Sequence, residues 1–218
     1  MAGLSNYTAQ AALNWITGKT AMPSLPTVYV ALFTAVGTDA ASGFTEVSGN
    51  AYARAATSGA TWNAASGTAP SSASNASTIT FPTATGSWGT VIAWGLYDAS
   101  SAGNLLAWDY LGAVDWLPFS CSSASPGVLT VPGGASAFTL ANGDSVVVDA
   151  EFGGTLPTLS AGSWTGLLTV AGLSGDTFNV GLNTTSTGAA MAKKVSAVAP
   201  GLGVVTSFAA GALVLKAA

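Results

Sequence analysis

Apolar and polar positions along the chain alternate over short distances, and this pattern predicts strands more often than helices. The clearest run is TVYVALFTA at 27–35, which is apolar on both of its alternating faces and rich in β-branched and aromatic residues. It predicts a central strand buried on both sides. Two more runs, TVIAWGLY at 90–97 and LLAWDY at 105–110, flank the turn-rich residues 98–104 and predict a β-hairpin.

A second hairpin is expected from residues 136–140 and 145–152, on either side of ANGD at 141–144. The Asn-Gly pair supplies the positive φ angles that tight turns need. Shorter strands, separated by turn signals at the intervals of a sandwich or barrel, are predicted elsewhere. They span residues 51–57, 166–171, 177–182, 192–199, 204–208 and 212–215.

One short helix is predicted near the start of the chain, where Ser5 can cap it and Gly18 can end it. A helix of this length can pack across a sheet or reach to a neighbouring subunit. Its largely apolar flank consists of Tyr7, Ala11, Leu13, Trp15 and Ile16.

Together these elements predict an all-β fold, a β-sandwich or jelly-roll-like domain with one short N-terminal helix. A chain of 218 residues can form one large β domain or two small ones. Two glycines and a proline interrupt the predicted strands at 153–157. We therefore expect a main domain at 1–155 and a C-terminal β extension at 156–218. Whether the break separates two domains or only two sheets stays open.

Charged side chains are scarce: Asp, Glu, Lys and Arg make up 6% of the chain, against roughly 25% in ordinary soluble domains. None of them occurs at 55–97 or 116–143. Such a neutral surface binds neighbours more readily than it repels them. The net charge of -4 and the five scattered cations argue against a nucleic-acid partner, which needs a dense Lys and Arg surface.

The segment 195–215 is uncharged and about as long as a membrane-spanning helix. We reject it as a span because Pro200, three glycines and several polar residues favour strands and turns. The start of the chain lacks the basic and apolar regions of a signal peptide. We therefore expect no membrane partner, and synthesis and assembly in the cytoplasm.

No catalytic, cofactor-binding or metal-binding residue is predicted. The chain has no histidine, the commonest general base and metal ligand. The single Cys121 cannot close an intrachain disulfide and is expected to be a small buried residue. The lone G-x-G at 201–203 is interpreted as a turn. Three Asn-x-Ser/Thr sequons, at Asn6, Asn75 and Asn183, are interpreted as chance in a Ser/Thr-rich chain.

Carboxylates offer the one alternative chemistry. Asp149 and Glu151 lie two residues apart on a predicted strand and so share one face, with Asp144 nearby at the turn. Such a group suits a glycosidase pair or a divalent cation. The spacing is unspecific, and a solvated strand face is the favoured interpretation.

Seven tryptophans raise the possibility of a carbohydrate platform. Trp88, Trp94 and Trp108 lie in or beside apolar strands, so we expect them in the core. The better candidates for exposed contacts to glycan or protein lie beside predicted loops and are Trp62, Trp116 and Trp164.

A likeness to a known family is carried by four stretches of the chain. They are residues 4–35, 46–54 (EVSGNAYAR), 79–111 and 207–215 (SFAAGALVL). The sequence resembles small virion proteins of tailed bacteriophages that are often labelled tail fibre, and its ending is similar to their terminal strand pair. The resemblance implies a β-sandwich particle component present in many copies, with no catalytic residues to carry over. It does not decide between capsid and tail.

Our leading expectation is a capsid decoration or cement protein that ties major capsid subunits together as a homotrimer on the outer shell. A neutral surface can bind copies of itself and the shell with little cost of charge desolvation. The main alternative is a tail fibre or baseplate subunit whose partners are other tail proteins and host-surface glycan. A virion-borne glycan hydrolase using Asp149 and Glu151 is the third and least favoured hypothesis.

Overall fold

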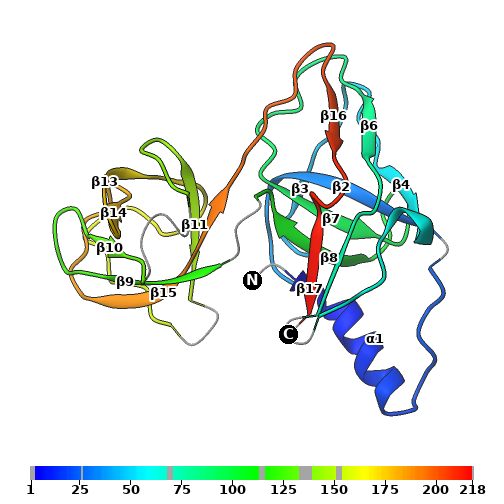
Figure 1. Ribbon diagram of the computed structural model, residues 1–218, viewed down its shortest axis with the longest axis horizontal. Coiled ribbons are helices and arrows are strands. Elements are labelled where there is room, and N and C mark those ends of the chain that lie inside the picture. The colour runs from blue at the N-terminus through cyan, green and yellow to red at the C-terminus, as the bar shows by residue number, and fades with distance from the viewer. Residues whose placement is uncertain are drawn as a thin grey trace. The chain divides into compact units, whose positions relative to one another are not determined.

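The computed structural model describes residues 3–25, 27–67, 71–112, 116–132, 139–150 and 154–217. The fold is all-β with one short α-helix near the start, as the sequence predicts. The chain forms two compact units (Figure 1): unit 1 is residues 1–111 with 197–218, and unit 2 is residues 112–196. The division expected from the sequence, at residue 155, differs from this one. Residue 155 lies within unit 2, where Thr155 bridges to Ala189.

The described residues of unit 1 form one α-helix, one 3-10 turn and ten strands, and the strands pair in antiparallel fashion. Its first part contains β1 (Gly3–Leu4), α1 (Asn6–Ile16), β2 (Thr27–Ala35), β3 (Thr45–Glu46), β4 (Ala55–Ser58), a 3-10 turn (Gly59–Thr61), β5 (Ser71–Ser74), β6 (Ile79–Thr83), β7 (Ala93–Tyr97) and β8 (Leu105–Tyr110). Its last part contains β16 (Val205–Phe208) and β17 (Val214–Ala217). The segment weighed above as a membrane span therefore holds strands, and no described helix is both long and apolar enough to cross a bilayer.

The main sheet of unit 1 has the order β1-β8-β7-β2-β3, with β4 also paired to β2. The predicted hairpin is present as β7 and β8, in which Gly95 lies opposite Trp108. β2 has the predicted bounds and pairs with β7 through five residues of register, among them Leu32 with Trp94. Residues 30–33 of β2 are all fully buried, so both faces of this strand are covered.

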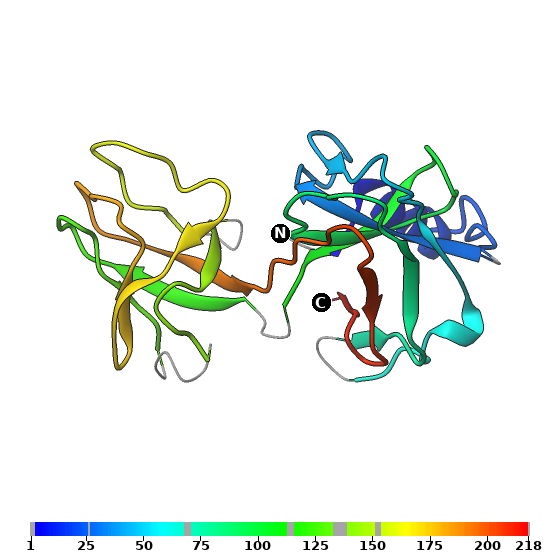
Figure 2. The same ribbon diagram turned by 90° about the horizontal axis from the view of Figure 1, so that it is seen from above.

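The C-terminal strands return to unit 1. They resemble a terminal strand pair in the sequence, but they do not pair with each other: β16 pairs with β6, and β17 pairs with β5. In Figure 2 they lie across from the sheet that contains β2, β7 and β8. Apolar side chains fill the space between, including Leu32, Trp94, Phe81 and Leu213.

A buried asparagine holds the returning segment. Asn75 is 0% exposed, and its side-chain amide donates to the carbonyls of Ser77 and Ala209, at 2.8 Å each. Its Oδ1 accepts from the backbone N–H of Leu213 at 2.9 Å. The predicted sequon at Asn75 is therefore a structural element that joins residues 71–77 to the end of the chain.

Unit 2 is one antiparallel sheet in the order β12-β11-β15-β9-β10-β14-β13. Its strands are β9 (Leu117–Cys121), β10 (Leu129–Thr130), β11 (Ser145–Asp149), β12 (Leu168–Thr169), β13 (Ala171–Ser174), β14 (Thr177–Asn179) and β15 (Gly188–Val195). The two edge strands, β12 and β13, are separated by Val170 alone, which is 1% exposed. The sheet must therefore curl until its edges nearly meet, around a core that includes Phe119, Val146 and Phe178.

The second predicted hairpin is present in part. The turn at 141–144 forms, with Gly143 at a φ of +93° and the Asp144 N–H donating to the Ala141 carbonyl. The arm that follows is β11, which pairs with β12 and β15. Most of the other predicted arm, 136–140, lies outside the described residues.

Candidate interaction surfaces

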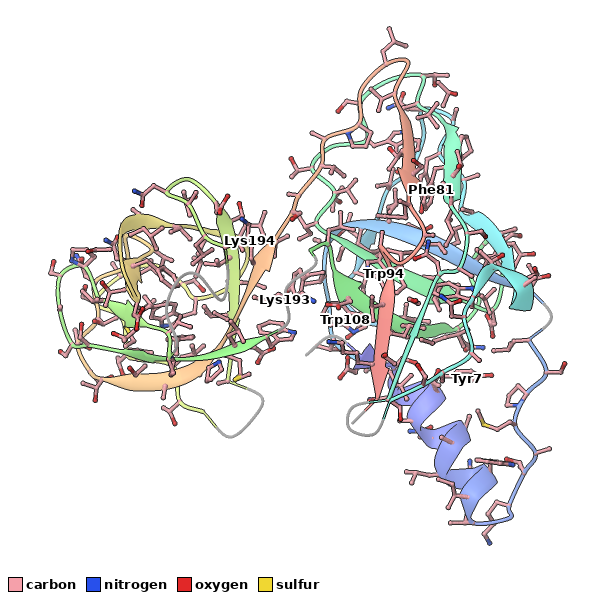
Figure 3. The ribbon with its side chains drawn as sticks, viewed as in Figure 1. Tyr7, Phe81, Trp94, Trp108, Lys193 and Lys194 are labelled. Atoms are coloured by element: carbon pink, nitrogen blue, oxygen red, sulfur yellow. The ribbon has the colours of Figure 1, made fainter. Side chains whose placement is uncertain are left out.

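The three tryptophans expected in the core are buried there. Trp88, Trp94 and Trp108 are exposed by 4% or less. Figure 3 shows Trp94 and Trp108 on neighbouring strands of the unit 1 sheet. The indole N–H of Trp108 donates to Asp39 Oδ1 at 2.8 Å, so its polar atom is satisfied inside the fold.

The three tryptophans expected to be exposed are not free platforms. Trp164 is buried in the core of unit 2, and its indole N–H donates to the Pro157 carbonyl at 2.8 Å. Trp62 packs half-buried against the core of unit 1 and donates to Thr57 Oγ1 at 3.1 Å. Trp116 is half-buried. A position beside a loop does not leave these side chains exposed, because Trp62 packs against the core of unit 1 and Trp164 belongs to the core of unit 2.

The exposed tryptophan is Trp15, on α1. The predicted caps of this helix are present: Ser5 Oγ accepts from the Thr8 N–H at 3.3 Å, and Gly18 follows the helix at a φ of +70°. No residue of α1 is fully buried, so the predicted apolar flank is only partly covered by the single chain. Leu13, Trp15 and Ile16 are 57–70% exposed.

A second apolar surface lies on the C-terminal part of unit 1. It consists of Val198, Leu202, Val204 and Val205, and Leu202 at its tip is 79% exposed. This surface contains the G-x-G at 201–203, which forms a turn as predicted, with Gly203 at a φ of +79°.

Among the described residues, the acidic candidates do not form one group. Asp144 pairs with Lys194 at 2.7 Å, and the hydrogen bond from Lys194 lowers the pKa of the Asp144 carboxyl. Lys194 also donates to the Thr139 carbonyl at 2.9 Å. Asp149 ends β11, and Glu151 lies outside the described residues. Asp144 thus has a partner in the fold and cannot be counted as a free ligand.

A second ion pair organises the hairpin loop of unit 1. Arg54 makes a two-pronged contact with Glu46, at 2.8 and 2.7 Å, and donates to the carbonyls of Ala99 and Ala102 in the loop between β7 and β8. The guanidinium also lies over the ring of Tyr97, 3.6 Å from its centroid. The planar guanidinium has five N–H donors, so it can bind a carboxylate and two backbone carbonyls at the same time. This group of contacts has a structural role, and we call it the Arg54 clamp.

The same carboxylate accepts from a buried phenol. Tyr52 Oη donates to Glu46 Oε1 at 3.0 Å and accepts from the Leu32 N–H at 2.9 Å. Burial, followed by the neighbouring Glu46 charge, raises the pKa of Tyr52 far above its ordinary value. Tyr52 is therefore a neutral hydrogen-bonding group that links β2 to the clamp, and it offers no acid or base at physiological pH.

Comparison with known proteins identifies the family. A profile of the family described as podophage GP4 fiber I protein gp80 matches residues 3–115, just over half of the 218 residues. The chain belongs to this family. Its members are virion structural proteins of tailed bacteriophages, which confirms the class that the sequence resemblance implied. No curated protein matches the chain.

The matched region ends close to a boundary between the two units. The matched residues begin at β1 and end four residues after Leu111, where the first part of unit 1 ends. They include α1, the β7–β8 hairpin and the Arg54 clamp. Unit 2, apart from its first few residues, lies beyond the match. The match supports the fibre alternative more than the capsid-decoration expectation.

Proposed function

We propose that this protein is a non-enzymatic subunit of a fibre on the tail of a bacteriophage. The observation that supports this proposal is the match of residues 3–115 to a phage fibre family. That match covers the first part of unit 1, which contains the larger part of its core. The capsid-decoration expectation has no comparable support.

The side chains fit a structural role. Two carboxylates form ion pairs within the fold, Glu46 with Arg54 and Asp144 with Lys194. The remaining surface is largely Ser, Thr, Ala, Gly and apolar residues. We propose that its partners are copies of itself and other tail proteins, because neutral surfaces associate with little loss of charge hydration.

The fibre alternative also included contact with host-surface glycan. It was expected to use Trp62, Trp116 and Trp164, and these side chains are buried or half-buried. We further propose that the subunit joins the particle in the host cytoplasm, where tails are assembled.

The proposal is tested on purified particles of the phage that encodes the chain. Gold-labelled antibody against the chain should mark the tail, and gel densitometry should give a few dozen copies per particle or fewer. The same antibody, applied before infection, should reduce adsorption to host cells. Label spread over the head, with hundreds of copies, would establish the decoration role and refute the fibre role.

A further inference from the structure

The segment 6–25, here called the helix arm, consists of α1 and the chain that follows it. Figure 1 shows α1 leaving the unit 1 sheet and the chain returning to β2. The arm exposes six large apolar side chains by 40–70% each. They are Tyr7, Leu13, Trp15, Ile16, Met22 and Leu25.

The arm is attached to unit 1 at its first turn. Ser5 Oγ donates to the Leu105 carbonyl, and Thr8 Oγ1 donates to the Leu106 carbonyl at 2.8 Å. Beyond this turn no residue of α1 is buried. A helix of 11 residues is marginal in water without packing, since isolated helices shorter than about 12–15 residues rarely persist. The arm therefore needs a further surface to cover it.

The shape of the apolar surface indicates how many neighbours it faces. At 3.6 residues per turn, Asn6, Gln10 and Asn14 form one polar stripe. By the same geometry, Trp15, Ile16 and Leu13 spread over an arc of about 160° on the rest of the helix. One flat partner covers less than such an arc. Two neighbouring surfaces cover it, as in a bundle around a symmetry axis.

The exposed area agrees with an interface between subunits. Burying a large apolar side chain removes roughly 100–200 Å², so six that are about half exposed present roughly 300–600 Å². A standard interface takes about 800 Å² from each partner, of which roughly 60% is apolar. The arm thus carries close to the apolar area that one partner contributes.

The charge of the arm favours like partners. Lys19 is the one Asp, Glu, Lys or Arg side chain among residues 3–25, and it follows the helix. Identical arms can therefore pack without like-charge repulsion along α1. A foreign partner would ordinarily be selected by complementary charge, which α1 lacks.

We infer that the helix arm is the self-association surface of this protein, where α1 packs against the α1 helices of other copies around a symmetry axis. The inference deepens the proposed function, because a fibre subunit repeats in the particle. It is tested without the particle, so its failure and the failure of the fibre role can be told apart.

The first experiment measures the mass of the purified full chain by light scattering during size exclusion, at tens of micromolar. The wild type should be an oligomer of three or more copies, because each α1 then has two neighbours. The double variant Leu13→Ser with Ile16→Ser should be a monomer that still unfolds cooperatively in urea, because neither side chain is buried in the single chain. The matched control Leu202→Ser removes a more exposed apolar side chain elsewhere and should keep the oligomer.

The second experiment places a thiol on the arm. Cys121 is buried, so an Ile16→Cys variant carries one accessible thiol. Mild oxidation should link its copies into covalent dimers, whereas a Leu202→Cys variant should remain largely unlinked. A monomeric wild type, an oligomer that survives the double variant, or equal cross-linking at both positions would overturn the inference.

Discussion

Replacing Asn75 with alanine tests how the end of the chain is held to unit 1. The change removes the side-chain donors to Ser77 and Ala209 and the acceptor for Leu213. It leaves the backbone of residue 75 able to keep its own hydrogen bonds, which join it to Gly211 at 2.7 Å and to Leu213 at 3.2 Å. The perturbation is therefore confined to three side-chain hydrogen bonds in a buried site.

The magnitude follows from the burial of those partners. A hydrogen bond contributes about 1 kcal/mol net, and a buried group left without a partner costs about 1–3 kcal/mol. Three bonds lost together should lower the free energy of unfolding of unit 1 by about 3 kcal/mol. With a urea dependence of about 1–3 kcal/mol per molar, the midpoint should fall by roughly 1–3 M.

Urea unfolding followed by tryptophan fluorescence measures this change, because five of the seven tryptophans belong to unit 1. The matched control is Asn63→Ala, which removes one exposed hydrogen bond, to Ser74 Oγ at 3.1 Å. Its midpoint should move by less than a third as much. If Asn75→Ala shifts the midpoint no more than this control, the buried amide does not hold the C-terminal segment and the reasoning is wrong.

Three further changes probe other contacts. Arg54→Ala should destabilise unit 1 by about 3 kcal/mol in urea, because it leaves the Glu46 carboxylate partly buried without its cation; a change below about 1 kcal/mol would refute the clamp. The pKa of Asp144 is lowered in the folded state by Lys194, so this pair stabilises unit 2 above the unfolded pKa near 3.9 and the contribution is lost as pH falls through the folded pKa. The urea midpoint of Asp144→Asn should therefore lie below that of wild type at pH 7, and the gap should narrow as pH falls below about 4; a gap that stays constant on further acidification would contradict this. Burial raises the pKa of Cys121, so a thiol reagent at pH 8 should react with it only in denaturant, and rapid reaction of the native protein would show that the core of unit 2 opens.

The elements predicted best are those whose sequence alone specifies them. β2 and β8 have the predicted bounds, because β-branched and aromatic residues suit strands in any context. The helix is flanked by its predicted Ser5 cap and Gly18. Local capping chemistry decides these ends, so distant partners are not needed to find them.

The elements missed depend on distant partners. β5 lies in a Ser/Ala tract with little strand propensity, and it exists because Ser71–Ser74 pairs with β17 more than 130 residues later. β9 contains Pro118, which argues against a central strand, yet it pairs with β15. The exposure of the helix arm could not be predicted either, because an apolar flank has the same sequence whether its partner is the same chain or another copy.

The returning C-terminal strands explain why the family region is not the whole of unit 1. β5 and β6 have as partners β17 and β16, which lie outside the matched residues. Leu213, buried in the core with Phe81, also comes from the returning segment. Residues 3–115 alone would therefore leave two strands unpaired and the core open.

Unit 2 is therefore inserted in the sequence between the two segments, 1–111 and 197–218, that together form unit 1. An insertion requires its entry and exit to lie close together. They do: a Cβ on Gly112 would lie 2.5 Å from the Lys194 carbonyl oxygen, and Gly112 has a φ of +149° that other residues rarely adopt. Because unit 2 has its own sheet and its own core, its surface can change without altering the core of unit 1. Unit 1 therefore holds the residues that match the family together with the helix arm, whereas unit 2 lies largely beyond the match and folds around a core of its own.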